Sequence, residues 1–114
     1  TSFGAEGKMK KPGSKLDKLY QKLVDTGKVD LIISGHENSQ QHIYIPGKPD
    51  MLISGVGGYT HKEDSESQIL LAKELKFRSI EAGCVKIDVR RNELRIGFYN
   101  TKNNVLYSLK IKKT

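Results

Sequence analysis

His36 is the residue of this 114-residue chain whose type and position are best suited to chemistry. It follows Gly35 and an apolar run at residues 29–34 (VDLIIS), which predicts a strand buried on both faces. In open α/β sheets, ligand-binding groups gather just beyond the carboxyl ends of strands. A neutral imidazole is the commonest protein ligand for a metal ion. The position therefore makes His36 a candidate metal ligand, with a hydrogen-bonded structural histidine as the alternative.

Four other chemically active features have simpler interpretations. We expect His42, in a strand of mixed polarity predicted at 41–45, to face solvent or a neighbouring strand. His61 follows the glycine-rich residues 55–58 and is a candidate substrate contact, because such loops often rim active sites. The acidic stretch at 63–66 is expected to be a solvated loop rather than a metal cluster. Cys84 is the single cysteine, so it forms no internal disulfide, and we expect it to be a small buried apolar residue.

The elements that must position these residues follow from apolar spacing and turn signals. Apolar residues at 16, 19, 20, 23 and 24 predict a helix over 14–27, with Ser14 as its N-cap and Gly27 at its C-terminal end. Strands are predicted at 41–45 and 51–54, and a short helix is hinted at by the apolar residues of 69–75. Segments 83–89, 93–99 and 105–111 are separated by turns, which predicts an antiparallel meander.

These elements place the chain in the α/β (α+β) class, and its length allows one domain at most. We find no second set of elements to cover the far face of the sheet, so the chain alone is expected to fold poorly. No apolar run is long enough to span a membrane, and the start lacks a secretion signal. Because the chain begins with Thr1 rather than methionine, we expect an excised or processed segment, and localisation stays open.

The net charge of +7 raises the question of an anionic partner. Residues 1–28 carry seven lysines and three acids, and residues 84–114 carry eight basic and two acidic side chains. The middle, with five basic and eight acidic residues, is negative. The lysine-rich start contains only two aromatic residues for stacking bases, so a solvated basic surface is expected and a nucleic-acid partner is not.

Residues 30–41 (DLIISGHENSQQ) resemble the last metal-binding motif of the calcineurin-like metallophosphoesterases, most closely the purple acid phosphatases. In that family a strand leads into Gly-His-Asp-His-Asn-x-Gln. Residues 51–58 (MLISGVGG) look like the Ser-Gly-Ala-Gly strand and loop that follow, and the meander is similar to the family's closing strands. The resemblance covers nearly the whole chain in order. It implies the C-terminal part of an αββα two-sheet sandwich.

The resemblance also implies a site with two divalent or trivalent metal ions, such as Fe, Zn or Mn, that hydrolyses phosphate monoesters. His36 would be one ligand, and Asn38 stands as a weaker ligand where the family has a second histidine. Glu37 occupies a variable position to which we assign no ligand role. The family's other ligands precede this motif, and no histidine precedes His36. Residues 1–114 are therefore expected to be the C-terminal segment of one metallophosphatase-like domain, inactive without an N-terminal metal-binding part that this chain lacks.

Two functions follow as alternatives, with different partners. The first is part of a purple-acid-phosphatase-like enzyme whose partners are its own missing N-terminal portion and a phosphate-ester substrate. The second is a catalytically degenerate phosphatase fold used as a scaffold or membrane-complex anchor, as in the glideosome-associated proteins of apicomplexan parasites. Asn38 favours this second function. A free-standing basic binding domain is a third hypothesis, and it requires the resemblance to be accidental.

Overall fold

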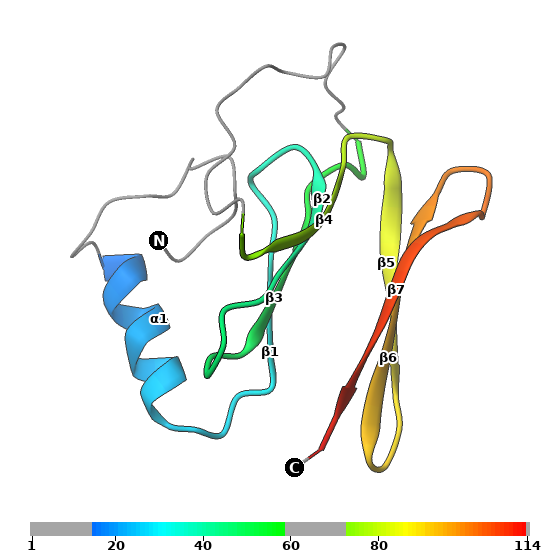
Figure 1. Ribbon diagram of the computed structural model, residues 1–114. Helices are drawn as coiled ribbons and strands as arrows, with labels where there is room; N and C mark the ends of the chain where they lie inside the picture. Colours follow the sequence, from blue (N-terminus) through cyan, green and yellow to red (C-terminus); the bar gives the residue numbers. More distant parts are fainter. Residues whose placement is uncertain (1–14, 59–72, 114) are drawn as a thin grey trace.

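One helix and two β-sheets make up the computed structural model, which describes residues 15–58 and 73–113. The helix lies on one side of a four-stranded sheet, and a three-stranded sheet lies on the other side (Figure 1). In chain order the elements are α1 (Lys15–Asp25), β1 (Leu31–Ser34), β2 (Gln40–Ile43), β3 (Asp50–Ser54), β4 (Leu75–Ser79), β5 (Gly83–Val89), β6 (Glu93–Asn100) and β7 (Val105–Lys112).

Helix α1 confirms the predicted amphipathic helix, and its buried side packs on the four-stranded sheet. Tyr20 is 3% exposed and clusters with Ile43 and Met51. The helix ends as expected, because Gly27 takes φ +67° and its N–H donates to the carbonyl of Val24 at 3.1 Å. The predicted N-cap, Ser14, lies outside the described residues.

The four-stranded sheet has the order β1-β3-β2-β4. Strands β1 and β3 run parallel, while β2 is antiparallel to both β3 and β4. The prediction that the first strand is buried on both faces is wrong, since β1 is an edge of this sheet and Ile33 is 52% exposed. The prediction of a short helix from the apolar residues of 69–75 is wrong at Leu75, because Leu75 begins strand β4. Residues 69–71 lie outside the described part of the chain.

The three predicted closing strands are confirmed as the antiparallel meander β5-β6-β7. Its inner face packs on the four-stranded sheet through a core that contains Leu52, Ile96 and Phe98. Phe77 of β4 stacks on Tyr107 of β7 with ring centroids 4.7 Å apart. The expectation that one sheet face stays uncovered is therefore wrong, because the meander is itself the second layer. The chain folds back on itself to cover that face.

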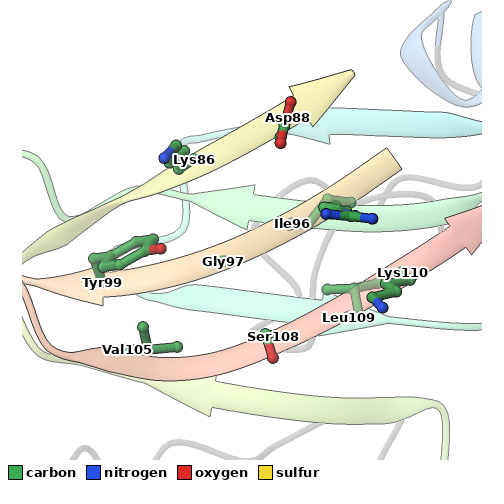
Figure 2. A pocket seen from close by; sticks show the side chains of 10 residues that line it. Lys86, Asp88, Ile96, Gly97, Tyr99, Val105, Ser108, Leu109 and Lys110 are labelled. Atoms are coloured by element: carbon green, nitrogen blue, oxygen red, sulfur yellow. The ribbon is translucent and has the colours of Figure 1, made fainter. Parts of the chain in front are cut away.

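The outer face of the meander carries a groove of about 620 Å³ that is lined by both charged and apolar residues, among them Lys86, Asp88 and Val105 (Figure 2). Gly97 lies in this groove beside Tyr99, and a Cβ on Gly97 would lie 2.8 Å from the Cε1 atom of that tyrosine ring. Cys84 is exposed, so the prediction of a buried cysteine is wrong. Strand alternation explains the error, because Val85 and Ile87 take the inward positions of β5 and turn Cys84 outward.

Candidate functional site

His36 lies in the loop that follows the carboxyl end of β1. Strand β3 runs parallel to β1, so the loops after Ser34 and Ser54 lie at the same edge of the sheet. His36 is exposed and has φ +73°, a left-handed backbone conformation that residues other than glycine rarely adopt. Such conformations cost free energy and are concentrated at functional sites. The backbone of His36 is therefore an unusual feature of this loop.

Hydrogen bonds between backbone groups hold this loop in place. The N–H of Glu37 donates to the carbonyl of Gly35 at 2.9 Å, and the N–H of Ser39 donates to the carbonyl of Glu37 at 2.9 Å. The N–H of Gly55 then donates to the carbonyl of Ser39 at 3.0 Å. A Cβ on Gly55 would lie 1.8 Å from the carbonyl oxygen of Glu37, so only glycine allows the two loops to approach this closely.

The side chain of Glu37 turns into the protein, away from solvent. Glu37 is 1% exposed, and its Oε1 accepts a hydrogen bond from Nε2 of Gln41 at 2.8 Å. The same Nε2 donates to Oγ of Ser39 at 2.7 Å, and both Ser39 and Gln41 are fully buried. One carboxylate oxygen of Glu37 is therefore bound by Gln41 inside the protein.

The described residues do not form a metal centre by themselves. His36 is exposed and Asn38 is half-buried, while His61 lies outside the described residues. Within 15–58 and 73–113, no group of three or more His, Cys, Asp and Glu side chains is placed to hold a metal ion. One imidazole and one neutral amide are too few for a zinc or iron site. The residues fit a metal only as one side of a site that other residues complete.

His42 forms a polar bridge between the two sheets. It is 6% exposed, with Nε2 2.6 Å from Oδ2 of Asp50 and Nδ1 2.9 Å from the hydroxyl of Tyr107. Asp50 is on the neighbouring strand β3, so the neighbouring-strand alternative for His42 is confirmed and the solvent alternative is wrong. Burial of the Tyr107 hydroxyl is the main cause that raises the pKa of Tyr107, and the nearby negative charge of Asp50 raises it further. Nothing in the sequence pairs residues 42 and 107, which lie on different sheets.

No family model matches the chain, but individual proteins do. It is 30% identical over 91 residues to purple acid phosphatase 7 and 26% identical over 92 residues to purple acid phosphatase 4, both from Arabidopsis thaliana. These alignments cover 80% and 81% of this chain, and the chain spans 27% of the length of each relative.

A solved structure has the same fold. GAP50, described as the anchor in the inner membrane complex of Plasmodium, matches with a TM-score of 0.72 and 23% identity over 90% of this chain and 31% of that one. The helix, the four-stranded sheet and the three-stranded sheet agree with the C-terminal part of a phosphatase sandwich. The predicted fold class is confirmed.

Proposed function

Starting from the C-terminal metallophosphoesterase-like region that the relatives and the fold support, we propose that this chain supplies His36 to a metal-dependent phosphate monoester hydrolase site. The other ligands of that site lie in an N-terminal part of the same domain, outside these residues. The single observation that carries the proposal is the exposed His36, held at φ +73° beyond the parallel pair β1 and β3.

Each residue near the site has a definite part in this proposal. Metal ions bound there would polarise the phosphate and lower the pKa of a bound water. His36 contributes an imidazole nitrogen from the edge of the sheet. Because His36 is exposed, side chains from another segment can bind the same metal ion beside it. Asn38 offers an amide oxygen, which is neutral and binds transition metals more weakly than imidazole. We assign Glu37 no ligand role, and in this proposal it holds the loop through its hydrogen bond with Gln41.

The open edge of β1 supports a missing part of the domain as the partner. Parallel strands are usually buried within a sheet, yet among the described strands β1 pairs only with β3. Of the large apolar side chains that are exposed in the described residues, three lie on β1 and α1, namely Ile33, Leu19 and Leu23, at 52%, 53% and 38%. About three-quarters of each relative's length lies outside the matched region, enough to supply neighbours for both elements.

A scaffold is the second candidate function, and Asn38 is the observation that favours it. Replacing an imidazole by an amide weakens one of the two metal positions that the resemblance implies. The fold match to an inner-membrane-complex anchor supports the same proposal. Across 15–58 and 73–113, no helix has the length and apolar character needed to cross a bilayer. As a scaffold, the chain would bind protein partners through its folded surface. This binding would not require the metal ions that the resemblance implies.

The two functions separate in one experiment on the complete gene product. Metal content is measured by elemental analysis, and hydrolysis of an aryl phosphate is measured in parallel. About two metals per chain with turnover, both reduced in His36→Ala, is the result expected of the enzyme. The matched control is Asn103→Ala, which also replaces an exposed residue at positive φ but in the turn after β6. Little metal and no turnover in the unmodified protein would exclude the enzyme and leave the scaffold.

A further inference from the structure

We propose that Glu37 and Gln41 are a positioning pair that holds His36 in its ligand conformation. The buried side chains of Glu37, Ser39 and Gln41 are here called the brace. This inference deepens the proposed function, since it assigns residues that orient His36 without touching a metal or substrate. The brace itself rests on the geometry of the loop.

The brace ties the His36 loop to the interior of the sheet. Gln41 belongs to β2, which pairs with β3 on one side and β4 on the other. From this fixed strand its Nε2 donates both hydrogens, one to Glu37 at 2.8 Å and one to Ser39 at 2.7 Å. Both acceptors flank Asn38 and lie within three positions of His36. The side chain of Gln41 therefore fixes the loop on a strand that is paired on both sides.

Burial indicates that this arrangement has a role beyond filling space. A carboxylate that is 1% exposed is costly unless it is hydrogen-bonded, and an apolar residue would fill the same space at lower cost. The backbone bonds at Glu37, Ser39 and Gly55 close the loop, and the brace selects the one closed form in which φ of His36 is positive. His36 itself is exposed, so the brace and not burial of the imidazole is the reason we assign for this conformation.

A swap of the two side chains tests the brace. Gln41→Glu places a second carboxylate against Glu37 and removes the donor, so the pair should separate. Glu37→Gln alone keeps an acceptor for Gln41 and should change little. The double variant Glu37→Gln with Gln41→Glu restores one amide and one carboxylate at the same positions. We expect the double variant to recover what Gln41→Glu loses.

The readouts are made by NMR on the full chain. The Cα and Cβ shifts of His36 report its left-handed backbone, and hydrogen exchange of the Ser39 and Gly55 amides reports loop closure. We expect Gln41→Glu to abolish the left-handed shifts and to speed exchange at both amides about 10-fold or more, with Ile96 and Phe98 in the meander unchanged. The swap should restore all three signals. A swap that recovers nothing, or left-handed shifts that survive Gln41→Glu, would overturn the proposal.

Metal binding by the complete gene product separates this proposal from the proposed function. If the unmodified protein binds Zn²⁺, Gln41→Glu should weaken binding on the order of 10-fold or more and the swap should restore it. If the unmodified protein binds no Zn²⁺, the proposed enzyme fails, while the NMR signature of His36 still decides the brace. If Gln41→Glu does not fold, the test is made on the folded double variant Glu37→Gln with Gln41→Glu. This variant must show the left-handed shifts of His36, and their absence would refute the brace.

Discussion

Replacing Gly55 by alanine should disrupt the candidate site and destabilise the fold together. The added Cβ would lie 1.8 Å from the carbonyl oxygen of Glu37 and 2.8 Å from its carbonyl carbon. Ordinary van der Waals contact begins at 3.4 Å, so Gly55 and Glu37 would have to move apart by about 1.6 Å, from 1.8 to 3.4 Å. Both groups are backbone, so no side-chain rotation relieves the clash.

The expected cost follows from the contacts that this movement breaks. Separation of the loops stretches the 3.0 Å hydrogen bond from Gly55 to Ser39, whose loss in a buried setting costs about 1–3 kcal/mol. Overpacking of the neighbouring atoms costs about 1–3 kcal/mol more. The free energy of unfolding should therefore fall by about 2–6 kcal/mol. For a chain of this size that corresponds to a decrease in Tm of roughly 8 °C or more.

Urea and thermal unfolding, followed by circular dichroism, measure this loss. The matched control is Gly57→Ala in the same loop, where a Cβ meets no atom within 4 Å and the stability should change by less than about 0.5 kcal/mol. The left-handed NMR shifts of His36 should disappear in Gly55→Ala and persist in Gly57→Ala. Equal stability of the two variants would refute the close approach of the two loops.

Three further predictions concern the meander and its bridge to the larger sheet. His42→Phe, which removes both ring hydrogen bonds from a buried bridge, should lower the free energy of unfolding by about 1–3 kcal/mol in urea titrations. Because burial raises the pKa of Tyr107, its contribution is present below the ordinary tyrosine pKa of about 10 and is lost as pH rises above it. The Tm should thus fall at alkaline pH, and less steeply in Tyr107→Phe. Gly83→Ala places a Cβ 1.8 Å from the carbonyl oxygen of Tyr99 and should destabilise strongly, whereas Gly97→Ala meets only the movable ring of Tyr99 and should be milder in the same assay.

Local sequence patterns predicted the helices and strands that form through interactions between residues close together in the sequence. The spacing of apolar residues and Gly27 predicted helix α1, and alternation with turn signals predicted the three meander strands. Strand β4 was missed although Leu75, Lys76, Phe77 and Arg78 alternate between apolar and basic side chains, because so short a segment gives little periodic signal beside the apolar residues that precede it. The edge position of β1 was missed for a different reason, since an apolar run does not reveal how many neighbours a strand has.

The candidate site divides in the same way. The sequence by itself determined that His36 follows a strand, that Asn38 stands where the motif it resembles has a histidine, and that glycines follow β3. Only the tertiary structure decided that Glu37 and Gln41 join inside the protein, and that His42 bridges to Tyr107 across 65 positions of sequence. The physical reason is that residue type and spacing act locally through backbone geometry, whereas burial and side-chain pairing depend on which distant strands come to lie side by side.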